Sequence, residues 1–146
     1  MVDVIARRGS HASPLRYPGG KATLAGFFES TIKALGLDKP TYIEPYAGGA
    51  GAGLELLVKD VVSMVVINDL DPAIHACWKS MVKESDAFLR LLERTPVTID
   101  EWRKQREVYR GRHDADVDPL ALGFATFYLN RTNRSGVLNG GPIGGL

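Results

Sequence analysis

One stretch decides the fold of this chain: Tyr42-Ile43-Glu44-Pro45-Tyr46-Ala47-Gly48-Gly49-Ala50-Gly51. It is a short apolar strand that breaks into a glycine-rich turn. Glycines at the carboxyl end of a strand let the backbone come close to a ligand at the start of the following helix, where a side chain would collide. A second apolar strand leads to Asp69, and the two strands are expected near residues 41–44 and 64–68. About 20 residues separate the turn from Asp69, an interval typical of a carboxylate that binds a ribose diol. The sequence therefore predicts an α/β fold with an adenosine-cofactor pocket.

Asp71 has a different predicted role from Asp69. It precedes Pro72, and an aspartate followed by proline is typical of a helix N-cap with proline at the first helical position. The helix that it would start carries an apolar stripe, which belongs in a core: Ile74, Cys77, Trp78 and Met81. Asp71 is thus expected to be structural, which leaves Asp69 as the better ribose ligand.

A second glycine motif lies upstream, Pro14-Leu15-Arg16-Tyr17-Pro18-Gly19-Gly20-Lys21. An amphipathic helix is expected to follow over residues 22–35 and to stop at Gly36. Its predicted inward face consists of Leu24, Phe27, Phe28, Ile32 and Leu35. The helix start would direct backbone N–H groups at a ligand carboxylate.

The C-terminal half is predicted to be helical. A helix is expected over residues 85–94, with Phe88, Leu89 and Leu92 inward. Thr98 and Glu101 form a capping box that opens a helix to about Arg112. Pro119 would begin a strongly apolar helix that ends at Asn130 and delivers a polar loop over residues 130–139.

The motifs, taken in order, resemble the Dam-like, alpha-class DNA adenine-N6 methyltransferases. The order is Gly-Gly-Lys, Glu-Pro-Tyr-Ala-Gly-Gly, Asn-Asp-Leu-Asp, Phe-Tyr-Leu-Asn-Arg and Asn-Arg-Ser-Gly, and the resemblance spans about residues 13–146. It implies a Rossmann-like, S-adenosylmethionine-dependent methyltransferase fold, incomplete here, with a helical insertion leading to a DNA-recognition region. The implied domains are a loose arm over residues 1–12, a cofactor-binding part over 13–94 and the start of the recognition region over 95–146.

The resemblance also implies which residues bind S-adenosylmethionine. Tyr17 and Lys21 would line its methionine end, and Asp69 would hold its ribose. The full implied set is Tyr17, Gly20, Lys21, Glu44, Pro45, Tyr46, Gly48 and Asp69. Other roles remain open at this point, because Tyr17 also suits ordinary packing, Lys21 a solvated helix start, and Glu44 an exposed strand end.

Double-stranded DNA is the implied partner of the polar loop. The implied DNA-binding residues are Arg131, Asn133, Arg134, Ser135 and Asn139. Asn139 stands where the family commonly has an arginine, and arginine reads guanine whereas asparagine prefers adenine. A DNA recognition sequence other than the family's GATC is therefore expected. The alternative that stays open is that residues 130–139 are merely a turn-rich connection without contacts to DNA. A basic group over residues 103–112 is interpreted as a solvated helix face, because Glu101 and Glu107 interrupt it.

The family's catalytic motif, Asp-Pro-Pro-Tyr or a close relative, does not occur in this sequence. Asp71-Pro72 and Asp118-Pro119 are followed by other residues. In the family this motif follows the recognition region, accepts the hydrogens of the adenine amino group and stacks on the flipped base. The chain is therefore expected to be truncated and inactive alone, and to need a complementary C-terminal half or to self-associate.

Composition sets broad limits on the function. The 146 residues are 45% hydrophobic and 24% charged, with a net charge of +1, ordinary values for one soluble domain. The one cysteine, Cys77, excludes an internal disulfide, and no segment resembles a signal peptide or a membrane span. A cytoplasmic location is therefore expected. No metal site is expected, because the three histidines are scattered along the sequence. Two alternatives stay open: a methyltransferase for RNA or protein, and a non-catalytic domain that binds DNA or cofactor.

Overall fold

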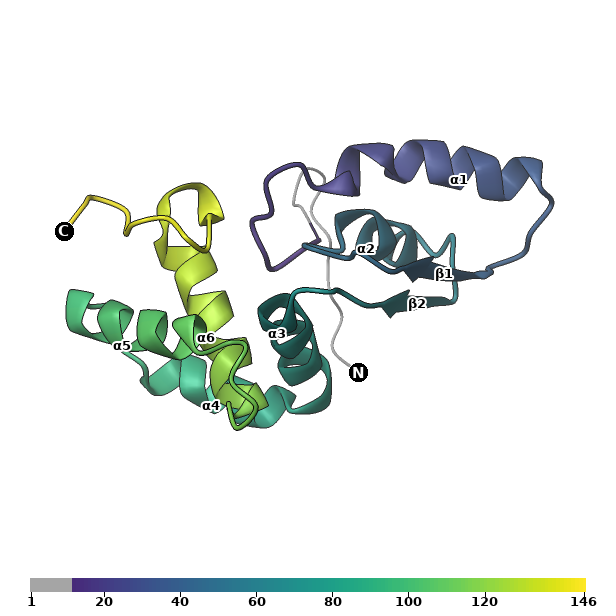
Figure 1. The fold of residues 1–146 in the computed structure, drawn as a ribbon. Helices are drawn as coiled ribbons and strands as arrows, with labels where there is room; N and C mark the ends of the chain where they lie inside the picture. The colour runs from purple at the N-terminus through teal and green to yellow at the C-terminus, as the bar shows by residue number, and fades with distance from the viewer. Residues whose placement is uncertain (1–11) are drawn as a thin grey trace. The chain divides into compact units, whose positions relative to one another are not determined.

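The computed structural model describes residues 12–146, which divide into two compact units (Figure 1). Of the described residues, the first unit holds 12–14 and 19–68, and the second holds 15–18 and 69–146. The short segment 15–18 therefore belongs with the second unit, although both of its sequence neighbours belong with the first. The arm expected over residues 1–12 lies outside the described residues, apart from Ala12.

The first unit is built on two parallel strands, β1 (Thr41–Glu44) and β2 (Met64–Ile67). Thr41 lies opposite Met64, and Glu44 lies opposite Ile67. A parallel pair needs a crossover connection, and α2 (Gly51–Val58) supplies it. The structure is a mixed α/β protein, as predicted, with the first strand at the expected residues and the second ending one residue early.

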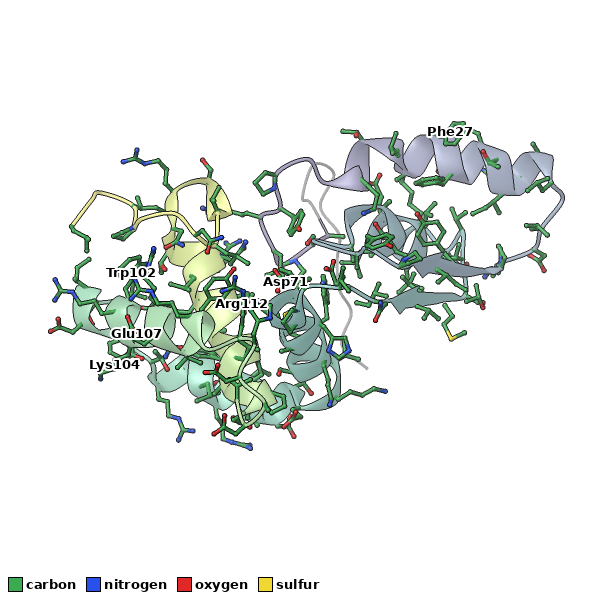
Figure 2. All side chains as sticks on the ribbon, viewed as in Figure 1. Phe27, Asp71, Trp102, Lys104, Glu107 and Arg112 are labelled. Carbon is green, nitrogen blue, oxygen red and sulfur yellow. The ribbon has the colours of Figure 1, made fainter. Side chains whose placement is uncertain are left out.

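Helix α1 (Ala25–Ala34) follows a short 3-10 turn, η1 (Lys21–Leu24), where the sequence predicted one helix over residues 22–35. Phe28 packs on Tyr42 of β1 with ring centroids 5.5 Å apart. Phe27 is 66% exposed, and Leu24 and Leu35 are exposed too. Figure 2 shows Phe27 on the outer side of α1. The predicted inward face is therefore only partly correct. The side of α1 that contacts the rest of the unit is narrower than the set of apolar residues that was predicted to face inward.

The strands also leave apolar side chains in solvent. Side chains alternate between the two faces of a strand, and Tyr42 and Val65 lie on the side that α2 covers. The alternate residues Ile43, Met64 and Val66 are exposed. The described part of the chain thus contains a sheet with one face uncovered.

The second unit is helical and consists of α3 (Pro72–Lys83), α4 (Ser85–Arg94), α5 (Ile99–Arg110), α6 (Pro119–Thr132) and the 3-10 turn η2 (Arg134–Gly136). Side chains cap three of these helices. Asp71 accepts the N–H of Ala73 at 2.9 Å, and Thr98 accepts the N–H of Glu101 at 3.2 Å. Asp118 caps α6 in the same way. The structural role predicted for Asp71 is confirmed, and α6 continues two residues past the predicted end at Asn130.

An apolar core joins the four helices. Phe88 of α4 meets Phe124 and Phe127 of α6, with ring centroids 5.7 and 5.4 Å apart. Leu89 and Leu92, predicted to point inward, are exposed, and Leu91 packs on the core instead. The prediction chose the wrong neighbours of Phe88, because residues 88 and 91 lie one helical turn apart on the side that faces α6.

The stripe predicted for α3 is buried as expected. Ile74, Cys77 and Trp78 are buried, and Met81 is partly buried against the core. Burial raises the pKa of the Cys77 thiol to about 12. Cys77 is therefore a core residue held in its neutral form at physiological pH.

Helices α3 and α6 approach closely at Gly123. A Cβ atom at this position would lie 2.6 Å from the Ala76 carbonyl oxygen and 2.5 Å from Ser80 Oγ. Backbone atoms cannot yield as a flexible side chain can, so the glycine sets the distance between the two helices.

Gly123→Ala is expected to lower the free energy of unfolding by about 1–3 kcal/mol, because the added methyl group overpacks this contact. Urea unfolding followed by circular dichroism measures the change. Gly26→Ala in α1 is the matched control, since a Cβ there meets nothing within 4 Å and alanine favours a helix by up to about 1 kcal/mol. Equal stability of Gly123→Ala and wild type would contradict the close approach.

The end of α6 is fastened to α5 by a buried hydrogen bond. Trp102 Nε1 donates to Asn133 Oδ1 at 2.7 Å. Arg106 lies over the Trp102 ring, 4.9 Å from its centroid, and donates to the Gly140 carbonyl oxygen at 2.6 Å. Both contacts run from α5 to the segment that follows α6.

Trp102→Phe is expected to destabilise the chain by about 1–3 kcal/mol, because it leaves the buried side-chain oxygen of Asn133, Oδ1, without its hydrogen-bond donor. The matched control is Lys104→Gln on the same helix, which removes an exposed ion pair to Glu101 and is expected to change stability by less than about 0.5 kcal/mol. Figure 2 shows Trp102 and Lys104 on α5. Identical urea midpoints for the two variants would show that the indole N–H has no structural role.

Candidate functional site

In the first unit, the glycine turn is organised around a buried carboxylate. Glu44 is 3% exposed, and its Oε1 lies 3.1 Å from Lys21 Nζ at ion-pair distance, without an aligned hydrogen bond. Its Oε2 accepts the N–H of Gly53 at 3.3 Å, and Lys21 also donates to the Tyr46 carbonyl oxygen. Glu44 is therefore not the exposed strand end that the sequence left open. It ties the Gly-Gly-Lys motif to the strand and to α2.

The glycines after β1 allow close packing as well as a sharp turn. Gly48 and Ala50 have left-handed φ angles of 50° and 48°. A Cβ at Gly51 would lie 2.9 Å from Ala22 Cβ, and one at Gly53 would lie 2.8 Å from Val65 Cγ1. The start of α2 thus sits directly against η1 and β2, where larger residues would not fit.

The other predicted cofactor residues of this unit lie at its surface. Gly20 precedes η1 and is exposed, as is Pro45, and Tyr46 is 71% exposed. Gly48 is buried in the turn. The unit therefore presents an open aromatic side chain, Tyr46, two residues after the buried carboxylate of Glu44.

The second unit carries the remaining two, Tyr17 and Asp69. Asp69 is partly buried, and its Oδ1 accepts the N–H of Asp71 at 3.0 Å. Tyr17 is 44% exposed. Burial raises the pKa of Tyr109, with Arg112 opposing and with Asp71 and Tyr17 adding to the rise. The charges of Asp71 and Tyr17 thus both act on Tyr109, and Asp69 precedes Asp71 by two residues.

The segment that carries Tyr17 is held by a side chain that sequence reasoning missed. Asn130 of α6 is 1% exposed. Its Oδ1 accepts the N–H of Arg16 at 2.8 Å, and its Nδ2 donates to the Arg16 carbonyl oxygen at 2.7 Å. The sequence placed Asn130 at the start of a polar loop. The sequence feature that could have revealed this role is the spacing of Asn130 with Thr126 and Asn133. All three are polar residues that lie on an otherwise apolar helix face and are buried.

The loop predicted to bind DNA closes on itself. Arg134 donates its N–H to the Gly141 carbonyl oxygen at 3.0 Å, and Ile143 donates to that of Thr132 at 2.9 Å. Between these bonds, Ser135 and Gly136 adopt left-handed φ angles of 56° and 72°. We call residues 131–143 the recognition loop. It is a folded structure, not a loose connection.

Four of the five predicted DNA-binding residues point outward from the recognition loop, and one does not. The exposed residues are Arg131, Arg134, Ser135 and Asn139. Asn133 is fully buried, accepts from Trp102 and donates to the carbonyl oxygens of Val137 and Leu138 at 2.9 and 3.1 Å. Asn133 therefore shapes the loop from inside.

The basic group on α5 is largely neutralised by its own helix. Arg103, Lys104 and Arg110 pair with acidic residues one turn away, Asp100, Glu101 and Glu107. Arg106 and Arg112 lie over the rings of Trp102 and Tyr109. Arg103, Lys104 and Arg110 thus fit the interpretation of a solvated face, whereas Arg106 and Arg112 are partly buried. The recognition loop is therefore the better candidate for nucleic-acid contacts.

Residues 12–146 contain no cluster of three or more His, Cys, Asp or Glu side chains that would suit a metal ion. Over the same residues, no helix is both long and apolar enough to cross a membrane.

Comparisons with known proteins match this sequence to a family. A family model for D12 class N6 adenine-specific DNA methyltransferases matches residues 17–139. The chain is also similar to the Type II methyltransferase M.MjaIII of Methanocaldococcus jannaschii, with 25% identity over 135 residues. That alignment covers 84% of this chain and 46% of the relative. The chain therefore spans about half the length of this relative.

The matched stretch begins at Tyr17 and ends at Asn139. It includes Tyr17 to Lys21 of the upstream glycine motif, the whole glycine turn after β1, Asp69 and most of the recognition loop. It covers most of the sequence and confirms the resemblance that the motifs indicated. The chain belongs to the D12 class N6 adenine-specific DNA methyltransferases.

Proposed function

We propose that this chain contributes the cofactor-binding and DNA-recognition parts of an enzyme that methylates the N6 atom of adenine in duplex DNA. The observation that carries the proposal is the family match over residues 17–139, which takes in Gly19-Gly20-Lys21, the glycine turn after β1 and most of the folded recognition loop. A complete Rossmann-like sheet is part of this proposal, and β1 and β2 would be two of its strands.

S-adenosylmethionine is the proposed methyl donor, and it supplies a methyl group on a sulfonium, which is a good leaving group. The side chains present suit such a cofactor chemically. Asp69 offers carboxylate oxygens to a ribose diol, while Tyr17 and Tyr46 offer exposed aromatic faces. Lys21 holds Glu44 and the Tyr46 carbonyl oxygen in place. Gly20, Pro45 and Gly48 give the backbone the shape that lets it approach a ligand.

The recognition loop is the proposed DNA-binding element. Arg131 and Arg134 would contact phosphates or guanine, and Asn139 suits adenine. Ser135 adds an exposed hydroxyl group, and Asn133 holds the loop backbone at Val137 and Leu138 from within. Because the loop is already folded, less conformational entropy is lost when it binds.

Methyl transfer itself requires groups that this sequence does not supply. The adenine amino group is a poor nucleophile, and no Asp-Pro-Pro-Tyr motif is present to accept its hydrogens and to stack on a flipped base. We therefore propose that these 146 residues are inactive alone. A complementary segment that carries this motif would complete the enzyme. Self-association would not supply the motif, but the uncovered strand face around Ile43 and Val66 supports an additional partner. A cytoplasmic location fits an enzyme that acts on chromosomal DNA.

The same missing motif favours one alternative, a non-catalytic domain that binds DNA or cofactor. Methylation of plasmid DNA by the purified chain would exclude this alternative and would also overturn the proposed inactivity. A methyltransferase for RNA or protein is the other alternative, and competition by unmethylated duplex DNA distinguishes it.

Calorimetric titration with S-adenosylmethionine tests the cofactor proposal. We expect saturable binding by the wild type, no comparable binding of NAD, and about ten- to hundredfold weaker binding by Asp69→Ala, because hydrogen bonds to a charged group contribute about 1.5–3 kcal/mol. Asp71→Asn is the matched control two residues away, since asparagine also caps a helix. Equal affinities of Asp69→Ala and wild type would contradict the role of Asp69 in ribose binding.

Binding of unmethylated duplex DNA at several salt concentrations tests the recognition loop. Arg131→Gln and Arg134→Gln are each expected to weaken binding. Each is also expected to reduce the slope of log affinity against log salt by about 0.9 for every phosphate that the variant no longer neutralises. Arg103→Gln is the control, because this guanidinium already pairs with Asp100 at 3.0 Å. If the control weakened DNA binding as much as the two loop variants, DNA would bind on α5 instead.

A further inference from the structure

Residues 15–18 carry a cofactor motif but are packed into the helical unit with the recognition loop. Leu15 is buried there, and the next residue, Arg16, is held by two hydrogen bonds between its backbone and the Asn130 side chain. Tyr17, the proposed cofactor residue, comes next in the chain. The position of Tyr17 therefore depends on a residue near the end of α6.

The same Asn130 side chain also holds the recognition loop. Besides its two bonds to Arg16, its Nδ2 donates to the Gly136 carbonyl oxygen at 3.0 Å. A buried asparagine has one carbonyl oxygen and two amide hydrogens, and here each has a partner. One side chain thus links the backbone before Tyr17 to the backbone after Ser135.

The two linked segments are also in direct steric contact. A Cβ atom at Gly136 would lie 2.7 Å from Arg16 Cβ and 2.7 Å from the Arg16 carbonyl oxygen. The φ angle of Gly136 is 72°. A shift of the recognition loop at Gly136 must therefore move Arg16 or break the Asn130 bonds, and a broken bond would leave buried polar groups unsatisfied.

We propose that Asn130 is a positioning residue that couples DNA binding to cofactor binding. DNA that holds the recognition loop in this conformation also holds Gly136 in place, the Asn130 bonds then keep Arg16 in position, and Tyr17 is thereby fixed against the cofactor. Coupling of this kind is reciprocal, so each ligand strengthens the binding of the other by the same factor. The inference rests on the proposed function, because it assumes that both ligands bind.

The test is a coupling measurement on the full chain. S-adenosylhomocysteine serves as the cofactor probe, because it lacks the transferable methyl group and cannot react. Its affinity is measured by calorimetry without DNA and with saturating unmethylated duplex DNA made by polymerase chain reaction. We expect the wild type to bind the probe about fivefold or more tightly when DNA is present, which is the low end of typical coupling factors.

Two variants interrupt the link in different ways. Asn130→Ala removes its three hydrogen bonds, and Gly136→Ala forces the two segments apart while Asn130 remains. Both are expected to bring the ratio of the two affinities close to one. Hydrogen exchange of the peptide over residues 13–20 shows whether the Arg16 amide has become unprotected while the helices remain protected, so a globally unfolded variant is recognised.

Two controls test the same elements without touching the link. Gly141→Ala adds a methyl group to the recognition loop where nothing lies within 4 Å. Thr126→Ala removes a buried hydroxyl group one turn earlier in α6, where it bonds only within the helix to the Leu122 carbonyl oxygen. Both controls are expected to keep the wild-type coupling ratio.

The outcomes separate the inference from the proposed function. No saturable probe binding by the folded wild type contradicts the proposed function, and the inference falls with it. Binding of both ligands without any coupling in the wild type contradicts the inference alone. A folded Asn130→Ala variant with the wild-type ratio also contradicts it. An affinity ratio close to one in both link variants, together with the wild-type ratio in both controls, establishes the inference.

Discussion

The rule that buried polar groups must be paired governs the C-terminal end of α6. Asn130 and Asn133 lie one turn apart, both without solvent contact. Their amides satisfy backbone groups of the segment before Tyr17 and of the recognition loop, and the Trp102 indole satisfies the carbonyl oxygen of Asn133. An unpaired amide in this position would cost more than the hydrogen bond contributes. The loop conformation is therefore specified by the helix below it, although its exposed residues have little packing of their own.

The first unit solves a different problem, which is to bring backbone close to backbone. Gly51 and Gly53 place α2 against η1 and β2 at distances that exclude a Cβ atom. Glu44 and Lys21 form an ion pair at the end of β1, in which the carboxylate is buried and the lysine is partly exposed. Loss of the lysine would leave a buried carboxylate without its charged partner, so the Gly-Gly-Lys motif and the strand motif act as one structural element. This explains in physical terms why the two motifs occur together.

Much of this could be predicted from the sequence, and the misses have physical causes. The strand at residues 41–44, the helix at 85–94 and the caps at Asp71 and Thr98 follow from local signals, namely apolar runs and capping residues. The exposed Leu89 and Phe27 were misplaced, because periodicity gives a stripe but not how much of it a neighbour covers. The roles of Asn130 and Asn133 depend on contacts with Arg16 and Trp102, far away in sequence. A pattern of polar residues after a helix looks the same for a loop that binds DNA and for side chains that hold such a loop.

The burial of Cys77 makes the chain convenient for spectroscopy. Its thiol is fully shielded and its pKa lies at about 12, so reagents that attack thiolates would leave it untouched in the folded protein. A cysteine introduced at an exposed position would therefore be the sole reactive thiol without removal of the native one. Pairs of such labels, one in each unit, would report the distances between the two units in solution and how these distances respond to ligands.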